Sequence, residues 1–166
     1  VQTCALRSDM WVGNYLSEEC GVKIHISPYT QIFDGKKFLI AHGEGLGSNN
    51  IGYKILLAIF RNKSLRAIYS MLHPSIGVGI GHKWSLNSRL GKEITMDFQG
   101  EEKEDLIRYS RSVLKNDKID YFIFGHRHLA LTYKLEQGSQ IFFLGDWIKQ
   151  GGFAEWDGKE LTLKVF

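Results

Sequence analysis

The chain has 166 residues, of which 43% are hydrophobic and 13% aromatic, and its formal net charge is +3. This length and composition suffice for one domain with a hydrophobic core, and they exclude a disordered or fibrous chain. The longest uninterrupted apolar run, residues 55–60, falls well short of the roughly 20 residues that a membrane-spanning helix needs. We therefore expect a soluble protein, or one that binds a membrane peripherally.

Charge is distributed unevenly along the chain. Residues 45–92 contain seven basic residues and no acidic one, so this segment carries +7 and the remainder carries −4. Such an asymmetry needs an explanation, for example an anionic partner. Cys4 and Cys20 form no metal-binding spacing, which favours a reducing compartment. The chain opens on Val1 without a targeting signal, so we expect the sequence to start inside a longer protein.

The first third of the chain predicts one helix and then short strands. Residues 8–21 favour the helix, whose start Ser8 or Asp9 can cap. Asp34-Gly35, which lies between two apolar runs, is a strong signal for a β-hairpin. The strands in this third are expected at residues 22–26, 30–33 and 37–41.

Residues 50–90 differ in character and predict an inserted, mostly helical, basic module. Pro74 marks a break in it, and a glycine-spaced stretch follows at residues 75–84. Apolar residues recur at helical spacing in two groups, at Ile51, Ile55 and Ile59 and at Leu65, Ile68 and Leu72.

After this insertion the chain predicts an α/β pattern. Residues 100–117 favour a surface helix, because acidic residues lie at its start and basic residues near its end, as the helix dipole prefers. Five strands are expected to follow, at residues 119–124, 129–135, 140–144, 153–156 and 161–166.

Two of the predicted strands lead directly to histidines. One is followed by His42, and the other by Gly125 and then His126 and His128. Ligands in α/β proteins gather at the carboxyl ends of strands, and imidazole is the commonest side-chain ligand for transition metals. These three histidines therefore predict a metal site, although a pair of histidines at a strand end also fits a hydrogen-bonded turn.

Two carboxylates lie near these histidines in the sequence, Glu44 and Asp146. A two-metal site usually needs a carboxylate that bridges the ions, but each of these two fits a turn residue better than a ligand. The remaining histidines, His25, His73 and His82, are interpreted as surface or hydrogen-bonded residues.

Three short motifs occur in the order HGEGLG (residues 42–47), FGHRH (124–128) and LGDW (144–147), with the basic insertion between the first two. This arrangement resembles the calcineurin-like metallophosphoesterases, and among them the bacterial UDP-2,3-diacylglucosamine diphosphatases of lipid A biosynthesis. The resemblance extends from Asp9 onward. It implies that residues 1–166 are one incomplete α/β/β/α sandwich domain and that residues 50–90 form a helical lid inserted in it.

The resemblance also implies a site for two divalent ions, commonly manganese. By resemblance His42 and His126 would bind one ion and His128 the other, and Asp9 matches a catalytic aspartate. Residues 6–8 replace the Gly-Asn-His that precedes this aspartate in the family, and two further ligand blocks are absent. We therefore expect that the chain as printed holds one ion or none and is inactive.

The reaction that the resemblance implies is hydrolysis of the diphosphate of UDP-2,3-diacylglucosamine to UMP and 2,3-diacylglucosamine 1-phosphate. The expected location is cytoplasmic and peripheral to the inner membrane. A phosphoesterase for another substrate and a non-catalytic remnant that binds a partner or a membrane remain alternatives, and the insertion could also be a lid with a merely solvated basic face. No nucleic-acid-binding motif is found. The residues expected to bind the substrate or an anionic membrane surface are Tyr53, Arg61, Lys63, Arg66 and Lys83.

Overall fold

The structure is a computed structural model of the chain, and it has two compact units. One unit comprises residues 1–48 and 96–166, and the other residues 49–95. No helix in the described part of the chain is long and apolar enough to cross a membrane. The residues described are 2–3, 15–47, 51–52, 55, 58–59, 62–90, 98, 100–146 and 150–166, without the side chains of residues 2, 3, 16 and 84–90.

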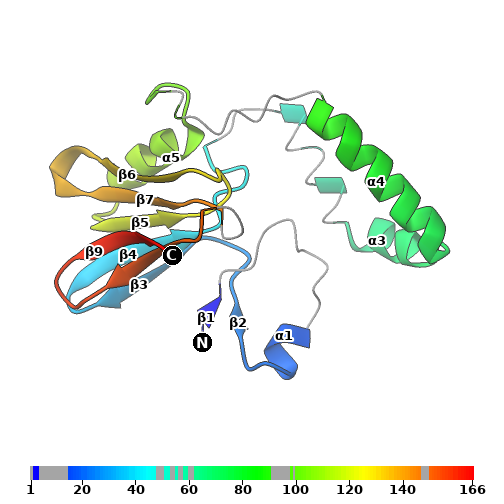
Figure 1. The fold of residues 1–166 in the computed structure, drawn as a ribbon, viewed down its shortest axis with the longest axis horizontal. Coiled ribbons are helices and arrows are strands. Elements are labelled where there is room, and N and C mark those ends of the chain that lie inside the picture. The colour runs from blue at the N-terminus through cyan, green and yellow to red at the C-terminus, as the bar shows by residue number, and fades with distance from the viewer. Residues whose placement is uncertain are drawn as a thin grey trace. The chain divides into compact units, whose positions relative to one another are not determined.

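A five-stranded mixed sheet forms the centre of the larger unit, with the strand order β3-β4-β5-β7-β6 (Figure 1). Strands β4, β5 and β7 run parallel to one another, whereas β3 and β6 pair antiparallel at the two edges. The three parallel strands therefore end at the same edge of the sheet. The strand bounds are β3 Tyr29–Phe33, β4 Lys36–Ala41, β5 Tyr121–Phe124, β6 Ala130–Lys134 and β7 Gln140–Leu144.

The hairpin predicted at Asp34-Gly35 is confirmed. Strands β3 and β4 pair in the register that brings Phe33 opposite Lys36, which leaves a two-residue turn. Both turn residues have positive φ, 48° at Asp34 and 78° at Gly35, as in the primed turns that match the twist of a hairpin. Trp156 also donates a hydrogen bond from Nε1 to Oδ2 of Asp34 at 2.7 Å.

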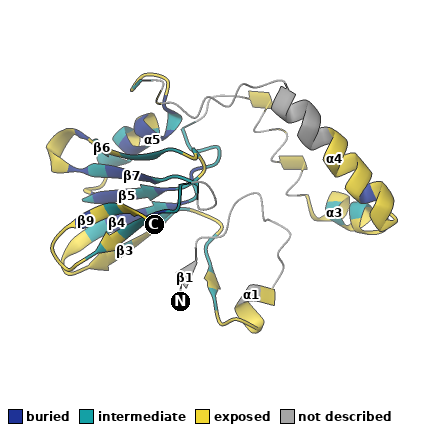
Figure 2. Cartoon of the chain, in the orientation of Figure 1, coloured by how far each residue is buried: buried dark blue, intermediate teal, exposed yellow. Residues whose placement is uncertain are grey.

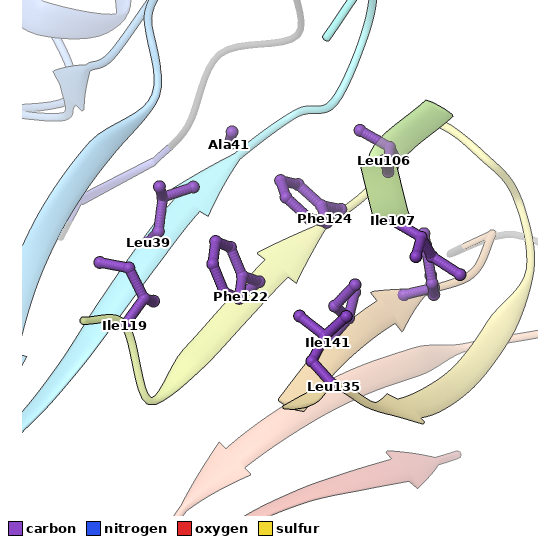
Figure 3. Close-up of a cluster of buried hydrophobic side chains, with 10 residues drawn as sticks. Leu39, Ala41, Leu106, Ile107, Ile119, Phe122, Phe124, Leu135 and Ile141 are labelled. Atoms are coloured by element: carbon purple, nitrogen blue, oxygen red, sulfur yellow. The ribbon is translucent and has the colours of Figure 1, made fainter. Parts of the chain in front are cut away.

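Both faces of the central sheet are covered, which explains why its parallel strands are continuous apolar runs. Helix α5 (Asp105–Leu114) covers one face, and the hairpin of β8 (Gly152–Trp156) and β9 (Leu161–Val165) covers the other (Figures 1 and 2). Alternate residues of each strand enter opposite cores because side chains alternate along a strand. The core under α5 holds Leu39, Ala41, Phe122, Phe124, Ile141 and Phe143 of the sheet with Leu106 and Ile107 of the helix (Figure 3). The core under the hairpin holds Phe38, Tyr121, Phe142 and Leu161.

The predicted strands and helix of the larger unit are present, with ends that differ by a few residues; β3, β4 and β8 begin one residue earlier than predicted. Helix α5 occupies the middle of the predicted 100–117, and β5 begins at Tyr121 rather than at 119. The α/β class is confirmed. A short 3₁₀ turn, η2 (Glu136–Gly138), connects β6 to β7.

The N-terminal helix is described only in part. Helix α1 spans Tyr15–Glu18, inside the predicted 8–21, and it ends before Gly21. The predicted caps Ser8 and Asp9 lie outside the described residues. After the helix, β2 (Lys23–Ile24) pairs in parallel with β1 (Gln2–Thr3) in a separate two-stranded sheet.

In the described part of the smaller unit, helices α3 (Lys63–Ser70) and α4 (Pro74–Leu90) lie on either side of the predicted break. Residues 51, 52, 55, 58 and 59, in the first predicted helical group, are also helical. Asn62 caps α3 by accepting hydrogen bonds from the N–H groups of residues 64 and 65, which satisfies donors that a helix start leaves unpaired. Pro74 is the first residue of α4, a position where proline is tolerated because its missing N–H needs no partner.

The glycine-spaced stretch lies inside α4 despite the low helix propensity of glycine. Gly77 is buried against α3, and its carbonyl oxygen accepts a hydrogen bond of 2.6 Å from the hydroxyl of Tyr69. A Cβ at residue 77 would lie 3.4 Å from that hydroxyl, in ordinary van der Waals contact. The hydrogen bond with Tyr69 therefore joins α3 to the first turn of α4.

Candidate functional site

His42 and His126 lie side by side at the edge where the parallel strands end. His42 directly follows β4, and His126 follows β5 after a single glycine. The centroids of their rings are 5.1 Å apart, with 72° between the ring planes. The N–H of Gly125 donates a hydrogen bond of 3.0 Å to the carbonyl oxygen of His42, which continues the pairing of the two strands into the loops. The sheet therefore brings together two histidines that are 84 positions apart in the sequence.

Gly125 provides space for the ring of His42. A Cβ at this position would lie 3.3 Å from Nδ1 of His42, closer than most side-chain contacts. The residues with positive φ in this loop are the histidines themselves, with 59° at His126 and 49° at His128.

The loop from Gly125 to His128 is a tight turn in a strained conformation. The N–H of Arg127 donates to the carbonyl oxygen of Gly125 at 2.6 Å, which closes a three-residue turn around His126. Such a turn with positive φ at its centre is the rarer and more strained form, and strained residues persist only where surrounding contacts hold them. The alternation of side chains along β5 ends at Phe124. The turn, and not this alternation, therefore sets the orientations of His126 and His128.

His128 pairs with a carboxylate from the third parallel strand. Asp146 lies two residues after the end of β7, and its Oδ2 is 3.3 Å from Nδ1 of His128. The Asp146 side chain is largely buried, with 15% of its surface exposed, whereas that of His128 is 53% exposed. Each of the three parallel strands thus contributes one polar side chain or more to this edge. The sequence ranked Asp146 as a turn residue, although its place at a strand end matched that of the histidines.

The surroundings of His126 lower the pKa of its imidazole and so favour the neutral form. Partial loss of hydration of the ring lowers the pKa of His126 below its usual value, although the residue remains exposed overall. The negative charge of Glu44 opposes this shift, while the charges of His128 and Arg127 add to it. A neutral imidazole carries the lone pair that a metal ion or a proton donor needs.

Arg127, between the two histidines, forms an ion pair with Glu104. Its Nε and Nη2 atoms donate to the two carboxylate oxygens at 2.9 and 2.6 Å. Glu104 occupies the N-cap position of α5, although its side chain makes no capping hydrogen bond, and it is 3% exposed. Nothing in the sequence indicates this pair, because its partners lie 23 positions apart and Glu104 is one of several acidic residues before the helix.

Imidazole and carboxylate groups are suitable donors for first-row divalent ions. Among the residues that the structure describes, however, no group of three or more histidine, cysteine, aspartate or glutamate side chains lies close enough to hold a metal. The described donors form two pairs, His42 with His126 and His128 with Asp146. The metal site predicted at His42, His126 and His128 therefore stays a prediction. The donor types fit it, and the three residues lie at one edge of the sheet.

A small, partly open depression lies beside this edge, with room for about one water molecule. The described residues therefore do not by themselves enclose a substrate. Its lining comes from two loops, with Ile26, Ser27 and Pro28 in one and Ala41, His42, Gly43, Glu44 and Leu46 in the other.

The other predicted site residues lie in the smaller unit or outside the described residues. Asp9, Tyr53 and Arg61 are not among the described residues. Lys63 and Arg66 lie on α3, and Lys83 lies on α4. All three belong to the smaller unit, whereas the histidine edge belongs to the larger one.

The fold and the site together define an α/β protein with paired histidine and carboxylate groups at the carboxyl edge of a mixed sheet. No family model matches the chain. Several proteins are similar to it in sequence. A UDP-2,3-diacylglucosamine hydrolase from Porphyromonas gingivalis is 34% identical over 94% of this chain and 64% of its own length. Proteins of the same name from Shewanella pealeana and Pseudomonas fluorescens are 28% and 25% identical, over 92% and 95% of this chain.

The chain is thus homologous to the UDP-2,3-diacylglucosamine hydrolases over nearly all of its length. The resemblance predicted from the motifs is confirmed at that level. The chain spans 64% of the length of each of these three relatives.

Proposed function

We propose that this chain carries the histidine half of a divalent-metal site that hydrolyses the diphosphate of UDP-2,3-diacylglucosamine, yielding UMP and 2,3-diacylglucosamine 1-phosphate. The observation that carries the proposal is the gathering of His42, His126, His128 and Asp146 at one sheet edge in a homologue of these hydrolases. The finer form of the fold, an α/β/β/α sandwich, belongs to the same proposal. The layers of α5, central sheet and β8–β9 hairpin support it.

In the proposed reaction His42, His126 and His128 are metal ligands and Asp146 is a further one. When bound at this edge, manganese ions supply the positive charge that polarises a phosphoryl group. The chain's own contribution is to keep the imidazoles neutral, oriented and close together. The lowered pKa of His126 fits this role, since a protonated ring could not act as a ligand.

The proposal is tested by UMP release from UDP-2,3-diacylglucosamine in the presence of manganese. We expect no turnover from the chain as printed, and turnover from a chain extended to full length with the remaining segment of the Porphyromonas gingivalis relative. In the extended chain His126→Ala should reduce activity by more than about 100-fold, the upper end for residues that only support metal ligands. His82→Ala, an exposed histidine of the smaller unit, is the matched control and should change little.

Two outcomes would contradict the proposal. Full activity of the His126→Ala variant would exclude this histidine as a ligand. A folded extended chain that binds manganese but releases no UMP would point to another phosphoester substrate.

We also propose that the smaller unit binds the lipid part of the substrate or an anionic membrane surface. Its helices expose many large apolar side chains next to basic ones, the pattern of a helix that lies in a membrane interface. Lys63 and Lys83 are exposed and Arg66 is partly buried. The exposed apolar residues are Ile51, Ile55, Ile59, Leu65, Ile68, Met71, Leu72, Ile76, Val78 and Ile80.

Binding to vesicles that contain anionic lipid should weaken as salt rises, because exposed charges are screened. The double variant Lys63→Glu and Arg66→Glu should bind at least about 25-fold more weakly, given about 1 kcal/mol per basic residue near an anionic surface. The control makes the same charge changes in the larger unit, at the exposed Lys115 and Lys118. Vesicle co-sedimentation measures both. Equal binding of all variants, or equal binding to neutral vesicles, would count against a membrane role.

A further inference from the structure

The ion pair of Arg127 and Glu104 differs from the other ion pairs of the larger unit in its burial. Its side chains are 21% and 4% exposed, and both carboxylate oxygens accept from the guanidinium. Arg111 and Glu101, also near α5, form an ordinary surface pair whose side chains are 31% and 49% exposed. A two-pronged guanidinium–carboxylate contact fixes orientation as well as distance. The Arg127 contact therefore constrains the loop that carries His126 and His128.

The start of α5 also holds the loop that follows His42. A Cβ at Gly43 would lie 3.1 Å from Cδ1 of Leu106, and a Cβ at Gly47 would overlap the carbonyl oxygen of Asp105. Both glycines have positive φ, 108° and 70°. The first turn of α5 is thus in close contact with the His42 loop through packing and with the His126–His128 loop through an ion pair.

We propose that Arg127 and Glu104 are positioning residues of the histidine site, and that their ion pair fixes the strained turn at His126 so that its ring lies against His42. The proposal rests on the proposed function to the extent that these histidines are metal ligands. Two observations support it. The residue between two positive-φ histidines is itself anchored, and its anchor is the helix turn on which the other histidine's loop packs.

The same geometry assigns a role to the positive charge of Arg127. An arginine between two candidate metal ligands could be expected to bind a substrate phosphate directly. Here Nε and Nη2 of its guanidinium are directed at a buried carboxylate. These two contacts assign the guanidinium to the support of the site.

The test measures the contact between the rings of His42 and His126 in the metal-free chain by NMR. Ring protons at this spacing give a nuclear Overhauser effect, and we expect it in the parent chain. Glu104→Gln and Arg127→Met should abolish it and speed amide hydrogen exchange at residues 126–128, while the amide shifts of the central sheet stay unchanged. Glu101→Gln removes a charge from the surface pair instead and should leave the effect intact.

Two further variants keep the test decisive in case a buried charge that has lost its partner prevents folding. Arg127→Lys keeps the charge but loses the two-pronged contact, so the ring contact should weaken without unfolding. The exchange of both residues, Glu104→Arg with Arg127→Glu, should restore part of it. An unchanged ring contact in folded Arg127→Lys and Glu104→Gln would overturn the proposal.

A second readout separates this proposal from the proposed function. Cobalt(II), which reports its ligands by visible absorption, should bind the Glu104→Gln variant about 10- to 100-fold more weakly than the parent, as for residues that orient metal ligands. If the parent chain bound no cobalt while Glu104→Gln still lost the ring contact, the metal site would be wrong and the positioning role would stand. Equal cobalt affinity in parent and variant, with the ring contact intact, would overturn the positioning role.

Discussion

Replacing Phe124 with alanine is expected to lower the free energy of unfolding by about 3–5 kcal/mol, the usual range for a buried phenylalanine. Phe124 is fully buried at the end of β5, just before the histidine loop. Its ring lies between those of Tyr109, Phe122 and Phe143, with centroids 6.1 to 6.3 Å away. The loss combines the transfer of the ring to water with the cavity that the close-packed neighbours cannot fill. Urea unfolding followed by circular dichroism measures it.

Phe33→Ala is the matched control for this prediction. Phe33 lies on the edge strand β3, is 42% exposed and contacts the ring of Phe38 at 5.2 Å. Its truncation removes less buried surface and leaves no enclosed cavity. We expect less than half the loss found at Phe124. Equal losses at the two positions would mean that the core under α5 is not packed as described.

Gly47→Ala is expected to destabilise the chain by about 2–5 kcal/mol, as the sum of left-handed backbone strain and overpacking. Gly47 has φ 70°, and a Cβ there would overlap the backbone of Asp105, which cannot move aside as a flexible side-chain end could. The loop after His42 would therefore have to leave α5. The same urea titration measures the change, and the ring contact between His42 and His126 should weaken with it.

Gly21→Ala separates strain from overlap. Gly21 has a similar φ of 62°, but nothing lies within 4 Å of a Cβ placed there. Its variant should therefore lose only the strain component, about 1–2 kcal/mol. If Gly47→Ala cost no more than this, the close approach of the His42 loop to α5 would be wrong.

Features that depend on neighbouring residues in the chain were predictable from the sequence. The turn at Asp34-Gly35 follows from the φ preferences of its two residues, and the apolar runs of β5 and β7 follow from burial on both faces. Histidines after two parallel strands had to meet at one edge, because such strands all end there. The placement of His42 near His126 thus required only the correct assignment of strands.

Features that depend on tertiary contacts were not predictable in the same way. The pairing of Asp146 with His128 requires knowing that β7 lies next to β5, and many strand-end aspartates only form turns. The glycines of α4 oppose helix formation locally, and the contact with Tyr69 outweighs that preference at Gly77. The ion pair between Arg127 and Glu104 involves two common surface residue types, so burial alone distinguishes it.

The close packing of Gly47 on Asp105 has a consequence for how such a protein can diversify. The chain leaves the α/β unit after residue 48 and returns to it at residue 96. Gly47, next to the exit, packs on Asp105 at the start of α5, so this contact within the unit does not depend on the length of the segment between residues 48 and 96. Doubling the length of a flexible connection costs only about 0.6 kcal/mol in closure entropy. A segment of different length can therefore follow residue 48 while the histidine edge keeps its packing on α5.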